Sequence, residues 1–276
     1  MSVVAQEPNL IAFAAQGDEE RRRRHGLKTT FVRVFEAHVD AMPAAMAAGV
    51  TAGEFRVIGK PASPDEAVAV VNAARAAAGS VPITAFSLVD LFELGNHTVV
   101  GLGELSKRLV DAGLQALAEL TIDVLPEGVT LPAAEVVVKT GLRMPRLTVR
   151  ESGAAARDRL IALAVEIQRA TGGVRAFAPL PRVSSIAQPS TGYDDVRTVA
   201  SARLQAHNID SIQVDWQRYG PKLAQVALTM GADDVDGVSP LEGELGRRRS
   251  PLEEIRGNIT AAGFEPIERN GLWESA

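Results

Sequence analysis

Short runs rich in β-branched residues alternate with longer alanine-rich segments along nearly the whole chain. The short runs have the length and composition of buried strands, and the longer segments have the spacing of about 3.6 residues per turn that marks a helix. This alternation is typical of successive βα units around a parallel sheet. We expect eight strands, over residues 29–34, 54–58, 81–86, 116–120, 146–149, 174–178, 211–215 and 233–238.

The helices predicted between these strands begin and end at residues with capping preferences. Ser63 is followed by a proline and two acids, and a capping serine, a first-turn proline and first-turn acids all favour a helix start. Glycines follow several predicted helices, as at Gly79, and favour their ends. We expect helices over residues 9–24, 39–48, 64–78, 102–112, 133–140, 154–171, 193–206, 221–230 and 251–262, and expect the first to close the bottom of a barrel.

Parallel βα repetition over 276 residues favours an α/β fold of the (β/α)8 TIM-barrel-like class over an open, doubly wound sheet. Against the open sheet, no G-x-G-x-x-G follows the first strand, and the sequence contains no G-x-x-x-x-G-K-[ST] phosphate loop. No repeat, low-complexity linker or change of composition marks a second domain. We therefore expect residues 1–276 to form a single barrel domain with an N-terminal helix at about 9–24.

The 276 residues contain no cysteine. Disulfides, thiolate zinc sites, cysteine nucleophiles and cysteine-ligated iron–sulfur clusters are therefore excluded. The net charge of -5 gives no overall basic field for nucleic acid or an anionic membrane. No stretch approaches the ~20 apolar residues of a membrane span, and the N-terminus lacks a basic segment leading into an apolar one, so we expect a cytoplasmic protein.

Polar residues follow the C-terminal ends of the predicted strands, where the loops of a barrel build its site. Arginine and lysine are frequent among them, and arginine binds a carboxylate or phosphate by two parallel hydrogen bonds. We therefore expect an anion-binding pocket without a metal. The predicted ligand-binding residues are Arg33, Lys60, Ser87, Arg150, Arg182, Asp215 and Trp216. Other polar residues at these ends are His38, Asp90, Ser184, Arg218 and Asp236.

Two carboxylates are weak candidates for catalysis. Glu119 on the fourth strand and Glu151 after the fifth would provide an acid and a base if they faced one another across the barrel mouth. The acidic run at 233–236 is a poor metal site, because consecutive side chains of a strand point to opposite faces and at most Asp234 and Asp236 share one.

Three segments carry a resemblance to a known family: TGGVRAFAPLPRV, STGYDDVRTVASARLQAHNIDSIQVDWQRYGPKLAQVALTMGADDVDGV and SPLEEIRGNITAAGFEPIERNGLW. They resemble the radical S-adenosylmethionine enzymes of the futalosine route to menaquinone. The resemblance is strongest to aminofutalosine synthase, followed by dehypoxanthine futalosine cyclase and the deazaflavin-forming FO synthases. The resemblance is specific over 172–273 and fainter upstream, in RHGLKTTFVRV, PITAFSLVDL and RLVDAGLQALAE. It implies a radical-SAM-type barrel.

The sequence departs from this family where the family performs its chemistry. Members place three cysteines, spaced C-x-x-x-C-x-x-C, in a loop after the first strand, and these hold a 4Fe–4S cluster. Here the strand predicted at 29–34 is followed only by residues 35–38 before the helix predicted at 39–48, so we expect that loop to be missing. Gly59-Lys60 stands for an expected glycine pair, and 147–150 replaces a tyrosine-glycine-histidine segment. The resemblance therefore implies a member without a cluster, and we do not expect S-adenosylmethionine to bind.

Three functions remain open. The first is a cluster-free member tied to menaquinone biosynthesis that binds an anionic or nucleoside ligand of the futalosine route. The second is a non-radical enzyme acting on a carbohydrate or a chorismate-derived carboxylate through Glu119, Glu151 and Arg150. The third is a structural partner of an intact homologue. The oligomers considered are a homodimer and a heterodimer.

Overall fold

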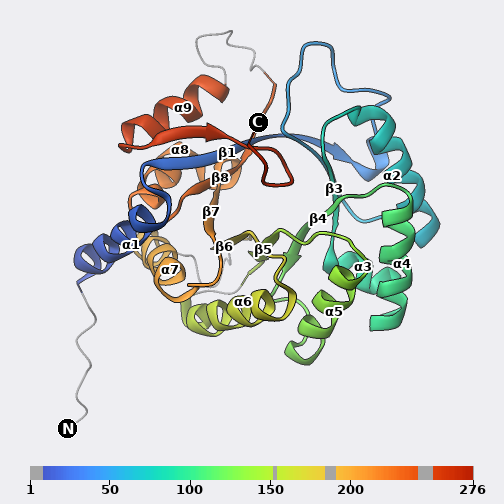
Figure 1. Cartoon of the computed structure of the whole chain (residues 1–276), viewed down its shortest axis with the longest axis horizontal. Coiled ribbons are helices and arrows are strands. Elements are labelled where there is room, and N and C mark those ends of the chain that lie inside the picture. Colours follow the sequence, from blue (N-terminus) through green and yellow to red (C-terminus); the bar gives the residue numbers. More distant parts are fainter. Residues whose placement is uncertain (1–8, 152–153, 184–190, 242–250, 276) are drawn as a thin grey trace.

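Eight parallel strands close into a barrel, with helices around it (Figure 1). The computed structural model describes residues 9–151, 154–183, 191–241 and 251–275. The neighbours run β2-β3-β4-β5-β6-β7-β8-β1, and β1 also pairs with β2, which closes the barrel and confirms the predicted fold class. The strands are β1 Lys28–His38, β2 Glu54–Ile58, β3 Ile83–Ser87, β4 Ala116–Thr121, β5 Arg146–Val149, β6 Ala176–Pro181, β7 Ser211–Asp215 and β8 Asp234–Val238.

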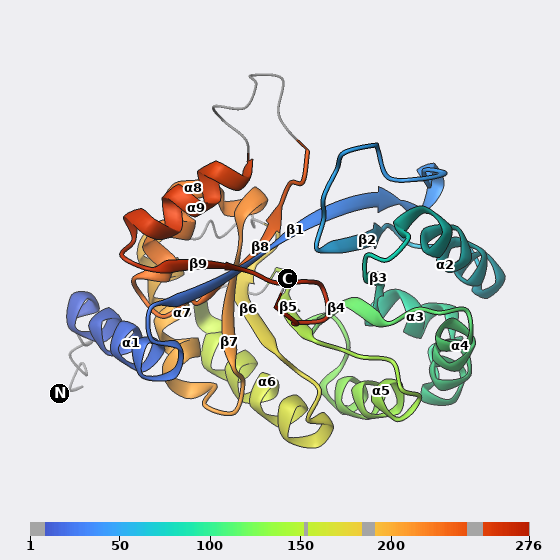
Figure 2. The same ribbon diagram turned by 45° about the horizontal axis from the view of Figure 1, so that its top comes forward.

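A further strand, β9 (Glu265–Glu268), was not predicted. It pairs with the first part of β1, with Lys28 beside Glu265, whereas β2 pairs with the last part of β1, with His38 beside Ile58. Thus β9 and β2 lie along successive parts of the same long strand, with β8 also paired to it (Figure 2). The length of β1 makes both pairings possible.

The helices follow the strands as βα units require. Ser63 caps α2 as predicted, since its hydroxyl accepts a hydrogen bond of 3.1 Å from the Glu66 amide. The helix α3 was not predicted, and α8 begins at Trp216 rather than at residue 221, with a kink at Gly220. The helices are α1 Leu10–His25, α2 Pro64–Ala78, α3 Leu88–Leu94, α4 Val99–Asp111, α5 Glu127–Lys139, α6 Arg157–Thr171, α7 Gly192–Gln205, α8 Trp216–Leu228 and α9 Pro251–Ala261.

The segment after β1 corrects the sequence prediction. The strand continues to His38, a single 3-10 turn covers Val39–Ala41, and residues 42–53 are irregular, so the predicted helix at 39–48 is wrong. Pro43 explains the difference, because proline lacks an amide hydrogen and clashes with the preceding turn of a helix. A loop is therefore present after β1, contrary to the expectation that it is missing.

The helix α1 packs beside α7 on the outside of the barrel (Figure 1) and does not close its bottom. Gly17 allows this close approach, since a Cβ atom there would lie 2.5 Å from the Met230 carbonyl oxygen and 3.3 Å from Cα of Ala200. Residues 269–273 lie at the bottom instead. The Gly271 amide donates to the Gly53 carbonyl over 2.9 Å, and the Trp273 ring lies 3.6 Å from the Arg269 guanidinium.

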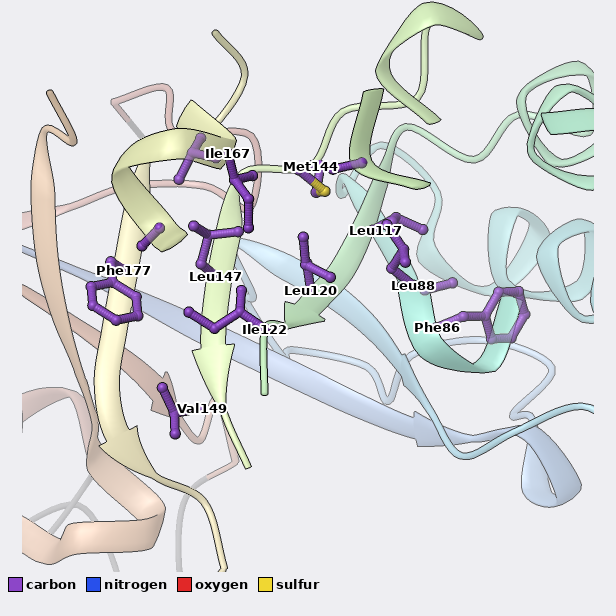
Figure 3. Close-up of a cluster of buried hydrophobic side chains, with 14 of the residues drawn as sticks. Phe86, Leu88, Leu117, Leu120, Ile122, Met144, Leu147, Val149, Ile167 and Phe177 are labelled. Atoms are coloured by element: carbon purple, nitrogen blue, oxygen red, sulfur yellow. The ribbon is translucent and has the colours of Figure 1, made fainter. Parts of the chain in front are cut away.

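The hydrophobic core involves the strands and the surrounding helices. Figure 3 shows side chains of β4, β5 and β6, including Leu120, Leu147 and Phe177, gathered with Ile167 of α6. Each of these four is at most 1% exposed, and burial of such a side chain stabilises the fold by about 1.5–3 kcal/mol. Within the described ranges, no helix combines the length and the apolar character needed to cross a bilayer.

Candidate functional site

The interior of the barrel is polar. At its lower level, the carboxylate of Asp234 on β8 accepts two hydrogen bonds from Arg269, over 2.7 and 2.8 Å. The same carboxylate accepts from the Gln213 amide over 2.7 Å and from the Thr30 hydroxyl over 2.5 Å. Asp234 is fully buried, and these donors satisfy it as burial of a charge requires.

At the next level, Asp236 binds two arginines from opposite sides of the barrel. Arg56 of β2 donates to it over 2.8 and 3.1 Å, and Arg146 of β5 forms an ion pair with it. Arg56 also donates to Glu54 over 2.7 and 2.9 Å, and Arg146 to the Ala118 carbonyl over 2.9 Å. This central network, Glu54, Arg56, Arg146 and Asp236, is buried throughout.

Electrostatics fixes the charge states of this central network. Burial alone would raise the pKa of Asp236, but Arg146 and Arg56 hold it well below its ordinary value. Burial lowers the pKa of Arg146, and the neighbouring Arg56 lowers it further. Both carboxylates of the network therefore stay ionised, which makes the group a charged floor for the space above it.

Above the central network, Arg182, the residue after β6, connects the adjacent strand β7 with β4, which lies two strands away. Its guanidinium forms an ion pair with Glu119 of β4 and lies 3.2 Å from Oδ2 of Asp215 at the end of β7. Thr148 of β5 donates to Glu119 over 3.3 Å. Burial lowers the pKa of Arg182, and Arg218 beside it adds to that effect.

A cavity of about 380 Å³ opens over this floor at the C-terminal ends of the strands. That volume lies within the range of small-molecule pockets. Five arginines line the cavity, namely Arg56, Arg146, Arg150, Arg182 and Arg218. The acids in its wall are Glu36, Asp90 and Glu119. The lining is thus dominated by groups that bind carboxylate or phosphate oxygens.

Arg150 differs from the other four arginines. Its backbone amide donates to Asp123 over 2.7 Å, but within the described residues its exposed guanidinium has neither a hydrogen bond nor an ion pair. Arg218, by comparison, lies 3.3 Å from Asp215 and donates to the Arg182 carbonyl over 3.3 Å. Arg150 is therefore available to a ligand at the rim of the cavity.

The structure brings together only part of the predicted ligand-binding set. Ser87, Arg150 and Arg182 line the cavity, and Asp215 adjoins it through Arg182. Asp90 and Arg218, named as further polar residues, also line it. Ser87 has a structural role as well, since its hydroxyl accepts from the Asp90 amide at the start of α3.

The other predicted residues lie outside the cavity. Arg33 pairs with Glu268 over 2.6 Å, and Lys60 pairs with Glu93 at the surface. Trp216 is buried in the hydrophobic core at the start of α8 and does not line the cavity. His38 accepts from the Asp40 amide in the turn after β1. Ser184 lies outside the residues that the structure describes.

The two catalytic candidates do not form an acid and base pair. Glu119 lines the cavity but its carboxylate is held by Arg182, whereas Glu151 is exposed and does not line the cavity. β4 and β5 are also adjacent, so residues at their ends do not face one another across the mouth. Asp234 and Asp236 share the interior face as predicted, and both bind arginine.

Sequence reasoning missed Arg56 and Arg146, because both lie inside strands and the search began at strand ends. The sequence did contain a signal for these residues, namely charged residues at alternate positions of two predicted strands. Glu54 and Arg56 occupy alternate positions of β2, as Asp234 and Asp236 do on β8. Alternate positions of a strand share one face, so charges there indicate a polar barrel interior.

Comparison with known proteins agrees with the predicted resemblance. The family model for the CofH/MqnC C-terminal region matches residues 176–276. A 5-amino-6-(D-ribitylamino)uracil–L-tyrosine 4-hydroxyphenyl transferase of Archaeoglobus fulgidus is 28% identical over 234 residues, which is 75% of this chain and 68% of that protein. An aminodeoxyfutalosine synthase of Thermus thermophilus is 28% identical over 224 residues, or 70% of this chain and 60% of that protein.

Solved structures show the same fold. Methylornithine synthase superposes with a TM-score of 0.63 at 12% identity, over 95% of this chain and 90% of that one. The FeFe-hydrogenase maturase HydG from Carboxydothermus hydrogenoformans gives a TM-score of 0.65 at 12% identity, over 96% of this chain and 73% of that one. At such low identity the likeness concerns the barrel alone.

Proposed function

We propose, from the similarity to aminodeoxyfutalosine synthases and the polar cavity, that this chain is a cluster-free relative that binds a small anionic ligand. We place that ligand among the carboxylates and nucleosides of the futalosine route to menaquinone. The relatives are longer, with 60% of the Thermus protein matched, so their activities do not transfer directly.

The observation that carries the proposal is the guanidinium of Arg150, which has no partner among the described residues, at the rim of a cavity lined by four further arginines. A carboxylate or phosphate at the rim would bind Arg150 by two parallel hydrogen bonds. The remainder of the ligand would fill the 380 Å³ below, where Thr121 and Ser87 are among the lining residues. Within the floor, Glu54 and Asp236 already balance the charges of Arg56 and Arg146, so the anion would be bound chiefly by Arg150 and the arginines above the floor.

The residues present do not fit an iron–sulfur cluster. Such a cluster is held by cysteine thiolates, and the 276 residues contain no cysteine. The loop over 39–53, which follows β1 as the cluster loop does in the family, has one histidine beside it, His38. We derive no radical step for this chain and expect binding without S-adenosylmethionine cleavage.

A thermal-shift and calorimetric panel tests the binding. It covers S-adenosylmethionine, 5′-deoxyadenosine, futalosine-type nucleosides, chorismate and its enolpyruvyl benzoate derivative. A ligand present at a hundred times its Kd stabilises the native state by about 2.7 kcal/mol, which is well within detection. We expect a pathway carboxylate or nucleoside to bind, and Arg150→Ala to abolish its binding.

Lys60→Ala is the matched control, because Lys60 is a surface cation that pairs with Glu93 and does not line the cavity. It should leave the affinity unchanged. Equal losses in both variants would show a general charge effect, and no binding by any compound would refute the proposal. Reconstitution with iron and sulfide should leave the protein colourless, whereas a stoichiometric cluster absorbance would refute the cluster-free assignment.

A further inference from the structure

Glu119 forms an ion pair with the guanidinium of Arg182, a group that an anionic ligand in this cavity would also bind. Both side chains of the Glu119–Arg182 ion pair reach the cavity, with 23% and 16% of their surfaces exposed. We infer that Glu119 competes with the ligand for the Arg182 guanidinium, so that a carboxylate or phosphate must displace Glu119 in order to bind. This inference rests on the anion binding proposed above. Glu119 would then set the affinity and selectivity of the site.

Arg182 is held in place by its backbone, so it does not leave when its partner does. Its amide donates to the Val149 carbonyl over 3.0 Å, and its own carbonyl accepts from Arg218 over 3.3 Å. The preceding carbonyl, of Pro181, accepts from the Tyr219 hydroxyl over 2.5 Å. Contacts from β5 and α8 thus fix the root of the Arg182 side chain at the end of β6.

Of the two carboxylates on Arg182, Glu119 is the one that can be exchanged. Asp215 caps α8, because its Oδ1 accepts from the Arg218 amide over 3.0 Å, and its Oδ2 lies 3.3 Å from the Arg218 side chain. Displacement of Asp215 would therefore cost a helix cap as well. Besides Arg182, Glu119 has one further hydrogen bond, from Thr148 over 3.3 Å, and no backbone contact among the described residues.

Exchange of one anion for another keeps the buried guanidinium paired. An unpaired Arg182 would be costly, since burial already lowers its pKa. A ligand oxygen that replaces the Glu119 oxygen avoids that cost, while the longer glutamate side chain turns toward solvent. Removal of the Glu119 charge should therefore strengthen anion binding, the reverse of what is expected of a residue that binds the ligand.

The test compares the binding of inorganic phosphate by calorimetry in a low-salt buffer. Glu119→Gln should bind phosphate at least about tenfold more tightly than wild type, because phosphate no longer has to break the charged hydrogen bond between Glu119 and Arg182. Glu36→Gln is the control, because Glu36 is an exposed carboxylate of the cavity wall. Its loss should change affinity by less than about fivefold, as expected for one exposed charge.

The double variant Glu119→Gln/Arg182→Gln should lose the gain, which ties it to the guanidinium. If Glu119→Gln does not fold, Glu119→Ser serves the same comparison. Equal gains in Glu119→Gln and Glu36→Gln, or a gain that survives in the double variant, would overturn the inference. Wild-type binding without any gain would overturn it while leaving the proposed function standing. If neither wild type nor Glu119→Gln binds phosphate or the panel compounds, both ideas fail.

Discussion

The substitution Asp236→Asn removes the carboxylate that Arg56 and Arg146 share at the centre of the barrel. Arg56 keeps Glu54, but Arg146 keeps only the Ala118 carbonyl as its partner among the described residues. Asp236 is 2% exposed, so water does not replace the lost charge. Removal of one partner from a buried ion pair costs about 3–5 kcal/mol, and we expect the lower end because asparagine still accepts a hydrogen bond.

Urea unfolding followed by circular dichroism measures this loss. A domain of this kind has about 5–15 kcal/mol of stability in total, so the variant should remain folded in buffer. Glu135→Gln is the control, because it breaks the exposed pair with Lys139 on α5, where the atoms are 3.3 Å apart. That change should cost about 0.3–0.5 kcal/mol. A loss for Asp236→Asn as small as the control's would refute the view that the interior charges depend on one another.

Two further predictions concern the same interior. Burial raises the pKa of Asp236, but Arg146 and Arg56 hold that pKa well below its ordinary value. The ionised Asp236 therefore contributes its full stability above about pH 4, and this contribution is lost as the pH falls below that. Between about pH 5 and about pH 3, wild type should therefore lose about 1 kcal/mol more than Asp236→Asn in urea unfolding, and equal losses would contradict the assignment. Gly271→Ala would place a Cβ atom 2.7 Å from Glu54, whose side chain Arg56 holds, and should cost about 1–3 kcal/mol. In Gly257→Ala of α9 the new Cβ atom meets nothing within 4 Å, and the change should raise the free energy of unfolding by about 0.5–1 kcal/mol. Thermal unfolding should therefore show a lower Tm for Gly271→Ala and a higher Tm for Gly257→Ala. A shift of both Tm values in the same direction would contradict these packing arguments.

The strands and the barrel were predictable because their signal is local. The strands β2, β5 and β7 have the predicted bounds, since a buried run of β-branched residues between turn residues specifies a strand by itself. The prediction of a helix at 39–48 was wrong because it gave more weight to the many alanines of this segment than to Pro43. The strand β9 is short and lies at least partly exposed, so it lacks the apolar run by which the others were found.

The site was predictable only at its rim. Arg150 and Arg182 follow strand ends, where a barrel places its ligands, and both line the cavity. Lys60 follows β2, whereas Arg33 lies inside β1, which is longer than predicted. Each is bound to a carboxylate distant in sequence, which local patterns do not reveal. The partners of Asp236 come from β2 and β5, and that convergence exists only once the barrel has closed.

Residues 265–273 have a consequence for the order of folding. The ribosome synthesises them after all eight barrel strands, yet β9 completes the pairing of β1, and Arg269 neutralises Asp234 in the interior. A nascent chain that has closed its barrel would still hold Asp234 without its guanidinium partner, and its lower end would be open. Productive closure should therefore wait until residues 265–273 have been synthesised, and proline or charge changes near Arg269 should slow maturation more than comparable changes in α4.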